Sequence, residues 1–298
     1  MNLLVVGKNK GSLRIKEEGE KRGHFVDLIH SSDLWVMVDN KRLVFRLMNK
    51  ELLLKDYDVL FTYTLSRRVW NWLLFLRHIR RKYPKLKIVY EKYADPKYKL
   101  YHTSLKEMIL QHKKQIPFPA SVVFFTKQGL KKAAKYLGFP MIIKVRQPGM
   151  YQKGRGVFLA HNLKEAREII ERHPKAYSYI AREFIPNDGD YRLFVVGYKV
   201  VAIMKRIPPP GDFRSNISQG GKGVGVKLSE VPELVSIAEK VSKVTRTEIA
   251  GVDIMVNKET GKPYVLEVNH GPQFAGIEKA TGINIAAKIV DYFEKLAK

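Results

Sequence analysis

The order of apolar and polar positions in the N-terminal third predicts strands that alternate with helices. Helical spacing predicts a helix from Ser12 to Arg22, which Gly23 ends, and a second helix over 66–84 with Ser66 as its N-cap. The predicted strands are 2–7, 24–29, 57–63 and 86–90. Because strands that alternate with helices form parallel sheets, we expect a small doubly wound α/β domain here.

The helix at 66–84 has an apolar surface wider than one sheet face needs. Trp70, Leu74 and Phe75 lie outside the expected core stripe. We interpret them as core packing. A dimer contact or an aromatic–basic RNA surface is the alternative, because several arginines surround them.

From Asp95 onward the pattern changes to paired strands, longer helices and a Gly- and Pro-rich segment. The expected helices are about 98–114, 127–137, 163–173, 230–245 and 283–296. The expected strands are 120–125, 139–145, 157–161, 178–184, a hairpin over 191–204, 249–256 and 263–268. The segment 207–225 is long for an irregular connection, and such segments are usually functional or disordered.

Composition excludes several classes of protein. The 298 residues contain no cysteine, which rules out disulfides, thiol catalysis and cysteine metal sites. The longest apolar run, 69–76, is too short to span a bilayer, and the first residues lack the basic region of a signal peptide. We therefore expect a cytoplasmic protein without membrane contact.

Charge changes the picture further. Lys and Arg number 54 against 29 Asp and Glu, which gives a net charge of +25. A surface this positive attracts polyanions such as nucleic acid, the ribosome or acidic peptides. A lysine-rich, thermophile-like surface without a specific target is the alternative, although such surfaces gain glutamate together with lysine.

The last two predicted strands carry polar residues among apolar ones. If 249–256 and 263–268 pair antiparallel, Asp253 comes close to Glu267 and Asn269, and the latter two share a face. Three oxygen side chains at one point suit Mg²⁺ or Mn²⁺. We expect Glu267 to be buried and therefore to need a cation. A carboxylate paired with an arginine is the alternative.

Lys144 lies in the apolar run "MIIKV", ahead of a loop that contains Gly154 and Gly156. Backbone N–H groups of a glycine-rich loop can approach a phosphate closely, and a nearby lysine supplies charge. Such loops are common, so this pattern alone favours an ordinary hairpin with a lysine that reaches solvent.

Two further stretches carry polar side chains. Glu183 ends a predicted strand, and the backbone after it could bind an adenine, while Asp190 and Arg192 share a strand face. Arginines in the Pro- and Gly-rich segment would stabilise developing negative charge on a phosphate. A solvated basic loop is the alternative. The polar residues in and next to this segment are Lys205, Arg206, Arg214 and Asn216.

The motifs "EFI", "GDFRSN", "GVDI", "LEVN" and "GIEKATGI" together resemble the ATP-grasp superfamily, and within it the RimK-like group of amino-acid ligases. The resemblance runs from about Asp95 to Lys298 and is looser before that. It implies an ATP-grasp fold of α/β and α+β class behind a small doubly wound parallel-sheet domain. The implied units are an N-terminal domain (1–94), a central subdomain with the phosphate loop (95–182) and a C-terminal subdomain with the metal site (183–298).

The resemblance also implies an activity. Such enzymes bind ATP and Mg²⁺ or Mn²⁺, phosphorylate a carboxylate and let an amine displace phosphate from the acyl phosphate. We therefore expect a ligase that adds an amino acid, commonly glutamate, to an acidic peptide, protein or small-molecule acceptor, and that forms homo-oligomers. The alternative is a basic module that binds RNA or the ribosome and keeps a vestigial ATP site.

Roles for single residues follow from the same resemblance. Lys144 would hold the α- and β-phosphates, and Glu183 and Phe184 would contact adenine. The nucleotide-binding set is completed by Gly154, Gly156, Asp190, Arg192, Arg214, Ser215 and Asn216. The implied catalytic residues are Arg206, Arg214 and Asn216. The implied metal ligands are Asp253, Glu267 and Asn269.

The chain departs from the group's pattern in two places. The loop after Lys144 is longer and more basic than expected. The turn "NHGPQF" replaces a turn of small residues near the carboxylate substrate, so His270, Gln273 and Phe274 bear on substrate identity. His270 would contact substrate or face solvent. Two candidates remain for a further nucleotide lysine, namely Lys97 and Lys99.

Overall fold

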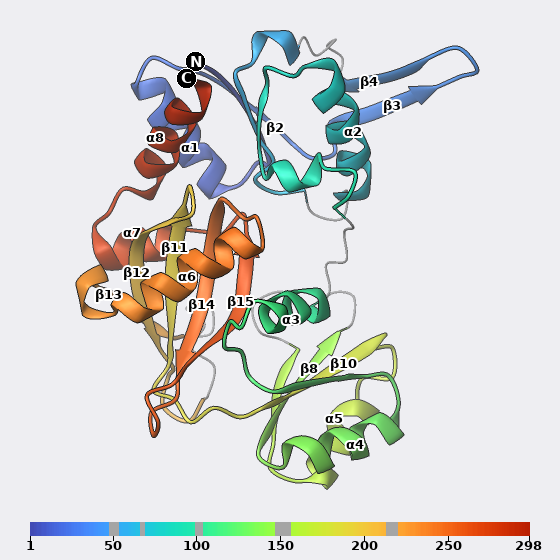
Figure 1. The fold of residues 1–298 in the computed structure, drawn as a ribbon, viewed down its shortest axis with the longest axis vertical. Coiled ribbons are helices and arrows are strands. Elements are labelled where there is room, and N and C mark those ends of the chain that lie inside the picture. The colour runs from blue at the N-terminus through green and yellow to red at the C-terminus, as the bar shows by residue number, and fades with distance from the viewer. Residues whose placement is uncertain (48–53, 66–68, 99–103, 147–155, 213–219) are drawn as a thin grey trace.

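The fold is taken from a computed structural model, which describes residues 1–47, 54–65, 69–98, 104–146, 156–212 and 220–298 (Figure 1). Over these residues the chain forms a parallel N-terminal sheet, an antiparallel central sheet and a larger antiparallel sheet, and a separate hairpin projects from the N-terminal domain. Short 3-10 helices occupy Leu54–Asp56, Glu91–Tyr93 and Leu228–Glu230.

The N-terminal domain contains the predicted parallel sheet. Its strands lie in the order β2, β1, β5, β6, and each pairing is parallel. The strands are β1 (Asn2–Val6), β2 (Phe25–Ile29), β5 (Val59–Phe61) and β6 (Lys87–Val89), and the helices are α1 (Lys10–Lys21) and α2 (Val69–Lys82). The predicted α/β class of this domain is confirmed.

The first helix begins two residues earlier than the pattern predicts. Asn9 is the N-cap, because its side chain accepts a hydrogen bond from the backbone N–H of Ser12 at 3.0 Å. The Ser12 hydroxyl in turn accepts from the Asn9 N–H at 2.9 Å. This reciprocal capping box makes Ser12 the third residue of the helix.

A projecting hairpin was not predicted. It consists of β3 (Leu34–Val38) and β4 (Leu43–Leu47), which pair only with each other among the described residues (Figure 1). Both of its faces carry apolar side chains, so the sequence shows no alternation that would mark it as a strand pair.

The apolar surface of α2 is only partly core. Phe75 is buried as expected, but Trp70 is 60% exposed and Leu74 is 61% exposed. The core interpretation is therefore wrong for these two residues. Ser66, the expected N-cap, lies outside the described residues.

The central sheet is antiparallel, with the strand order β7, β10, β8, β9. Its strands are β7 (Ser121–Phe124), β8 (Met141–Arg146), β9 (Val157–Ala160) and β10 (Ser178–Glu183). The helices α4 (Lys127–Leu137) and α5 (Leu163–Glu171) pack on one face through an apolar core. Residues of β8 alternate between this core and the other face of the sheet.

The large sheet is also antiparallel, with the strand order β13, β12, β11, β14, β15. Its strands are β11 (Asp190–Val196), β12 (Lys199–Ile207), β13 (Lys222–Val226), β14 (Ile249–Val256) and β15 (Pro263–His270). The helix α6 (Pro232–Val244) packs on one face. The helix α3 (Ser104–Lys113) lies between the large and central sheets (Figure 1).

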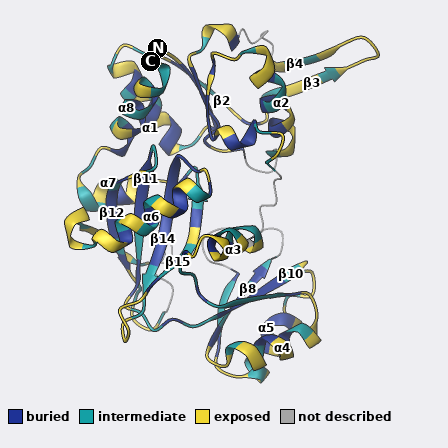
Figure 2. Cartoon of the chain, in the orientation of Figure 1, coloured by how far each residue is buried: buried dark blue, intermediate teal, exposed yellow. Residues whose placement is uncertain are grey.

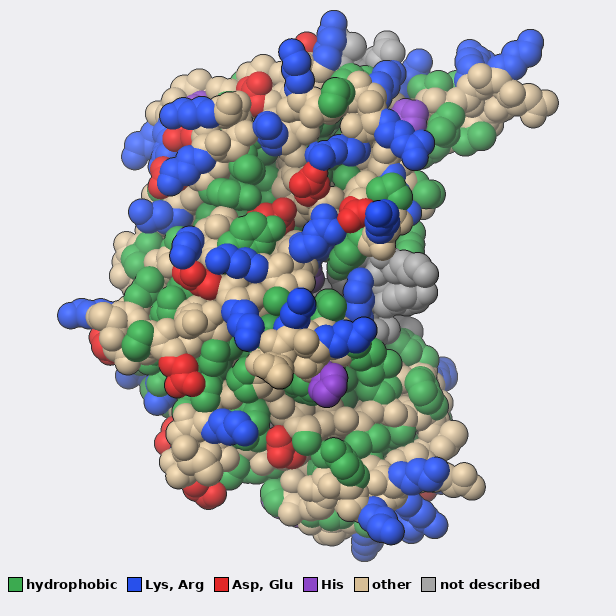
Figure 3. All heavy atoms as spheres, in the orientation of Figure 1, with side chains coloured by type: hydrophobic (Ala, Val, Ile, Leu, Met, Phe, Trp, Pro, Cys, Tyr) green, Lys and Arg blue, Asp and Glu red, His purple; other side chains and the backbone are tan. Residues whose placement is uncertain are grey.

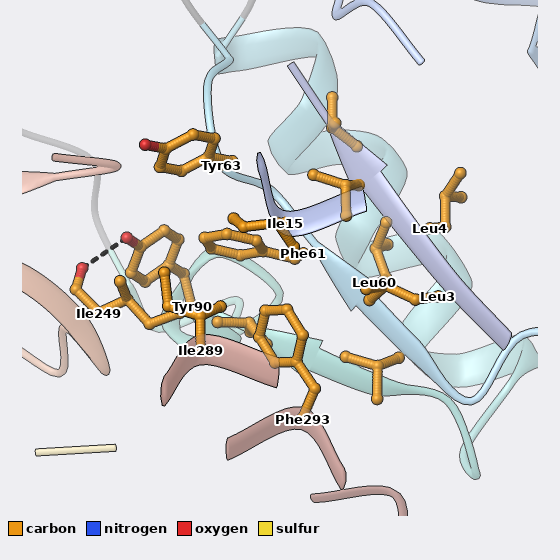
Figure 4. Packing of buried hydrophobic residues seen from close by; sticks show 14 of the residues in the cluster. Leu3, Leu4, Ile15, Leu60, Phe61, Tyr63, Tyr90, Ile249, Ile289 and Phe293 are labelled. Carbon is orange, nitrogen blue, oxygen red and sulfur yellow. Dashed lines mark hydrogen bonds between the residues drawn. The ribbon is translucent and has the colours of Figure 1, made fainter. Parts of the chain in front are cut away.

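The C-terminal helices pack against the N-terminal domain. The helix α7 (Ala275–Thr281), which the sequence did not predict, and α8 (Ile285–Ala297) share one core with the N-terminal sheet and part of the large sheet. In this core Phe61 of β5 packs against Phe293 of α8 at 5.3 Å between ring centres (Figure 4). The division at residues 94 and 182 stays a prediction, and this core crosses the first boundary.

Burial follows the layers. The middle strands of the large sheet are buried, while the outer surfaces of the helices are exposed (Figure 2). None of the described helices is both long and apolar enough to cross a membrane.

Candidate active site

The large sheet has one polar face. Register pairs Asp190 of β11 with Arg206 of β12, and Arg192 of β11 with Asp253 of β14. Alternate residues such as Leu193 point to the opposite face and pack under α6. The strands therefore gather two acids and two arginines on the face that α6 does not cover.

These four side chains form a continuous network of ion pairs. Arg206 binds Asp190 bidentately through the Nε and Nη2 edge of its guanidinium, with Nε 2.9 Å from Oδ1. Its Nη2 also lies 3.1 Å from Oδ2 of Asp253. Arg192 binds Asp253 in the same bidentate manner, with Nη2 2.8 Å from Oδ2. Burial by itself would raise the pKa of Asp253, but Arg192 and Arg206 outweigh it and hold that pKa below its usual value.

A glycine brings the connection between the sheets close to this network. Gly189 precedes β11 with φ +109°, and an added Cβ would lie 2.0 Å from the carbonyl oxygen of Arg206. Only glycine fits this approach, because a side chain would collide with backbone. The connection 184–189 therefore enters the large sheet directly beside the Asp190–Arg206 pair.

The expected antiparallel pairing of the last two strands is present. Asp253 lies opposite Glu267, and Gly251 lies opposite Asn269. The side-chain amide of Asn269 donates to Oδ2 of Asp253 at 3.4 Å. Asp253, Glu267 and Asn269 thus share one face of adjacent strands.

The expectation that Glu267 is buried is wrong. Glu267 is exposed, whereas its neighbours Val265 and Val268 are buried. An irregularity in the register next to Asp253 leaves Leu266 without a partner on β14. The residues of β15 that then lie on the same face as Asp253 are the polar Glu267 and Asn269. The carboxylate of Glu267 therefore reaches solvent on the polar face. Because it is not buried, burial gives no reason to expect a cation beside it.

Lys144 lies on the opposing wall of the site. It is on the face of β8 that points away from α4 and α5, and its register partner is Ile180. Burial lowers the pKa of Lys144 to about 8, and Arg182 adds to the shift, whereas Glu267 and Asp253 oppose it. Lys144 shares this face of the central sheet with Arg182, whose Nη1 lies 3.0 Å from the carbonyl oxygen of Leu266 on β15, so the face that carries Lys144 is turned towards the large sheet.

Arg182 and Glu107 complete this region and were missed by the sequence analysis. Arg182 of β10 is buried, and its Nη1 donates to the Leu266 carbonyl at 3.0 Å, so it ties the central sheet to the large one. Burial raises the pKa of Glu107 on α3 to about 7, and Glu267 adds to the shift. An arginine inside the apolar strand "SYIARE" was a usable signal, whereas nothing in its helix distinguishes Glu107.

The predicted adenine contact lies where the chain leaves the central sheet. The carboxylate of Glu183 accepts a hydrogen bond from the backbone N–H of Ala120 at 2.7 Å, so its side chain holds two backbone segments together. Phe184 is half-buried. A contact of this segment with adenine would use backbone groups and stays a prediction.

Several predicted residues cannot be placed. Gly156 is described, and its carbonyl accepts from the Val145 N–H at 2.8 Å. Lys97 is exposed beside Asp95. The predicted residues outside the described part of the chain are Lys99, Gly154, Arg214, Ser215 and Asn216.

The turn after β15 is not a free loop. His270 is the last residue of β15, and its Nε2 lies 2.6 Å from Nζ of the buried Lys92. Phe274 is 1% exposed and packs edge-on against Phe194, so it belongs to the core, and its bearing on substrate identity stays a prediction. Gln273 is exposed.

The RimK-like ATP-grasp domain matches residues 102–293, which is well over half of the chain. The chain belongs to the RimK-like ATP-grasp family. A relative from Psychromonas ingrahamii named "Probable alpha-L-glutamate ligase" is 32% identical over 307 aligned positions, covering 100% of this chain and 96% of that protein. A protein of the same name from Legionella pneumophila (strain Corby) is 43% identical over 164 positions, covering 54% of this chain and 52% of the relative. This RimK-like chain is therefore a ligase enzyme.

Solved structures share the fold of this RimK-like chain. The ATP-grasp ligase PsnB, solved with a precursor variant, Mg and ADP, gives a TM-score of 0.73 at 16% identity and covers 99% of this chain and 98% of that one. A RimK domain protein from Sphaerobacter thermophilus gives 0.67 at 16% identity, with 99% and 100% covered. At such identities the likeness shows the fold alone, and it confirms the ATP-grasp class.

The residues of the RimK-like site fit a divalent cation. Asp253, Glu267 and Asn269 lie on one face and carry carboxylate and amide oxygens, which are the donor atoms that Mg²⁺ prefers. Arg192 now binds both Asp253 oxygens and the Asn269 amide N–H points at Asp253, so a bound cation would replace these contacts. Among the described residues no group of three or more His, Cys, Asp or Glu side chains could hold a metal. A set of two carboxylates and an amide would leave further coordination positions to phosphate oxygens and water.

Proposed function

We propose that the protein is an ATP- and Mg²⁺-dependent ligase that forms an amide bond through an acyl phosphate. Glutamate is the proposed amino-acid substrate, and a peptide, protein or small molecule is the other partner. The observation that carries the proposal is the gathering of Asp253, Glu267 and Asn269 on one face of the large sheet, which the Arg182–Leu266 hydrogen bond joins to the face of the central sheet that carries Lys144. The names of the relatives that cover the whole chain support the choice of glutamate.

The proposed roles follow from charge and position. Lys144 and Arg182 supply positive charge to the phosphates, and their partly desolvated setting strengthens that attraction. A metal held by Asp253, Glu267 and Asn269 would neutralise phosphate oxygens. Arg206 is already bound to Asp190 and Asp253, so we propose that it orients those carboxylates and presents its charge to the site.

The reaction needs little covalent help from the protein. A carboxylate oxygen attacks the γ-phosphorus as ADP leaves, and an amine then attacks the acyl carbon, releasing phosphate and a proton. The proposed role of the two sheets is to hold the reacting groups in line. The remaining proposed nucleotide contacts are Gly154, Gly156, Glu183, Phe184, Asp190, Arg192, Arg214, Ser215 and Asn216, with Arg214 and Asn216 also proposed as catalytic.

The test is to replace Glu267 by glutamine and measure phosphate release with ATP, Mg²⁺ and a panel of amino acids. We expect a loss of at least about 100-fold, since one metal ligand contributes several kcal/mol to charge stabilisation. Because Glu267 is exposed, the Glu267→Gln variant should have the same thermal unfolding midpoint as the wild-type protein. Glu259→Gln, in the turn of the same hairpin, is the matched control. An unchanged rate for Glu267→Gln would refute the metal site.

A second candidate is a basic module that binds RNA or the ribosome. The net charge of +25 and the lysine and arginine side chains spread over the visible face favour it (Figure 3). A thermal shift by ATP and Mg²⁺ separates the two, because a vestigial site gives none.

A further inference from the structure

Side chains of the N-terminal domain form hydrogen bonds with the chain at the end of β15. The segment held, residues 270–272, consists of the last residue of β15 and the two residues after it, and it comes directly after Asn269. The contacts are Lys92 Nζ to His270 Nε2 at 2.6 Å, the Gly271 N–H to the Tyr90 hydroxyl at 2.9 Å, and the Tyr63 hydroxyl to the Pro272 carbonyl at 2.8 Å. Each residue of this segment is thus held by a different side chain from before residue 95.

The segment is also pressed against the N-terminal domain by its backbone. Gly271 has φ +57°, and an added Cβ would lie 2.0 Å from the carbonyl oxygen of Tyr63. A side chain at this position would push the segment away from the domain. The contact is therefore a close backbone approach as well as a set of side-chain bonds.

Tyr90 bridges the two strands that carry the proposed metal ligands. Its hydroxyl accepts from the Gly271 N–H and donates to the carbonyl of Ile249, the first residue of β14, at 2.6 Å (Figure 4). Because the strands are antiparallel, the start of β14 lies beside the end of β15. One buried hydroxyl thus ties β14 to the turn after β15.

Tyr90 adopts a backbone conformation that a tyrosine rarely adopts. Its φ of 63° and ψ of 49° are left-handed, and the residue is 0% exposed. A bulky side chain keeps such a conformation only where its surroundings determine it fully. The conformation aims the ring into the shared core and its hydroxyl at the ends of β14 and β15.

Lys92 holds the entry to β14 in a similar way. It is 1% exposed, and its ammonium group donates to the Thr245 carbonyl at 2.8 Å and the Thr247 hydroxyl at 2.6 Å. These residues form the turn between α6 and β14. Lys92 and Tyr90, two residues apart, therefore fix both the start of β14 and the end of β15.

We propose that Tyr90 is a positioning residue for the metal site, so that the N-terminal domain sets the spacing between Asp253 and Asn269. The proposal rests on the proposed function, because it concerns the ligands named there. Tyr90 is not one of the proposed metal ligands. It acts by bonding to Ile249, four residues before Asp253, and to Gly271, two residues after Asn269.

The test uses Tyr90→Phe, which keeps the ring and removes only the hydroxyl. Mn²⁺ binding in the presence of ADP, followed by calorimetry, is the readout, together with the Mg²⁺ concentration that half-saturates ATP turnover. We expect the affinity for Mn²⁺ to fall and the half-saturating Mg²⁺ concentration to rise, each by about 3- to 10-fold. The affinity for ADP without metal should change by less than about twofold.

Tyr179→Phe is the matched control. Tyr179 is also buried, and its hydroxyl donates to the His173 carbonyl at 2.9 Å in the central-sheet unit. It should lose thermal stability comparably and leave Mn²⁺ binding unchanged. Tyr63→Phe, which frees the Pro272 carbonyl, is a second variant and should weaken Mn²⁺ binding in the same direction.

The outcomes separate the two proposals. If the wild-type protein binds no Mn²⁺ with ADP, the proposed function fails and the positioning role fails with it. If the wild type binds and Tyr90→Phe and Tyr63→Phe bind equally well, only the positioning role is wrong. Equal weakening in Tyr179→Phe would also overturn it, because the effect would then reflect general loss of stability.

Discussion

Lys144 of β8 lies on the face of the central sheet that it shares with Arg182, away from α4 and α5. In the sequence it is a lysine in an apolar strand, for which a solvent-reaching side chain was the favoured interpretation. In the structure burial lowers the pKa of Lys144 to about 8, whereas the charges of Glu267 and Asp253 on the other sheet oppose that shift. The charge is therefore held in a partly desolvated site between the sheets.

Replacing Lys144 by methionine should weaken ATP binding about tenfold or more, because a charge-assisted contact to phosphate is lost. The free energy of unfolding should stay the same or rise, since the desolvated ammonium is removed. Calorimetric titration with ATP and urea denaturation measure the two effects. Lys199→Met, an exposed lysine paired with Glu239, is the control and should leave ATP binding unchanged. Unchanged affinity in Lys144→Met would contradict the phosphate contact.

The Asp190–Arg206 pair makes a second prediction at the residue scale. Arg206→Met removes the bidentate partner of a buried carboxylate and should cost about 3–5 kcal/mol of stability. Arg206→Lys keeps the charge without the planar fork and should recover only part of the loss. Urea denaturation measures both, and a methionine variant as stable as wild type would refute the structural role of the pair.

At the scale of elements, α3 brings an acid into the site that no motif marks. Burial and the charge of Glu267 raise the pKa of Glu107 from 4.5 to about 7, while Lys92, Arg182 and Lys144 oppose the shift. The folded state therefore binds more protons than the unfolded state between these pH values. The contribution of Glu107 to stability is present below pH 4.5 and is lost as pH rises through about 7.

Glu107→Gln should therefore flatten the dependence of unfolding free energy on pH between about 4.5 and 7. After allowance for solvent screening, we expect a gain on the order of 1 kcal/mol at pH 8 relative to wild type. Urea denaturation at several pH values measures it. Glu233→Gln, on the exposed side of α6, should keep the wild-type slope. A parallel profile in Glu107→Gln would show that the group does not titrate in this range.

Elements were predicted where their periodicity is plain. The helix at 127–137 and the strand at 249–256 match the observed α4 and β14 in full, because each has one apolar face and clear ends. The sequence analysis missed the β3–β4 hairpin and α7, each for a different reason. The hairpin is apolar on both faces and shows no alternation, and α7 is only seven residues long.

At the scale of the whole molecule, charge predicts how partners are met. The chain has a net charge of +25, and on the face shown in Figure 3 the lysine and arginine side chains are scattered from one end of the molecule to the other rather than gathered at one place. Spread charge favours attraction over distance rather than a single specific contact.

Binding of poly-L-glutamate should therefore weaken steeply as salt rises from about 50 to 200 mM, because screening shortens the range of the attraction. Fluorescence anisotropy with labelled poly-L-glutamate measures this, and single-stranded RNA serves as the comparison. Stronger binding of RNA together with no thermal shift by ATP and Mg²⁺ would favour the basic module. Affinity that does not depend on salt would argue against electrostatic attraction altogether.

The sequence by itself determined the class of elements, the alternation of strand faces and the residue types of the site. Local periodicity and register arise within a few residues, so they can be read along the chain. The antiparallel approach of Asp253 to Glu267 follows from one short turn, and it was predicted for that reason.

Tertiary structure decided the rest. The sequence did not show that Glu267 is exposed. It also did not show that the charges of Glu267 and Asp253 act on Lys144, or that the Tyr90 hydroxyl accepts a hydrogen bond from Gly271, because these residues lie far apart in the chain. Such contacts depend on how sheets and helices pack together, which no local pattern encodes. The same holds for α8, which completes the core of the N-terminal domain from the other end of the chain.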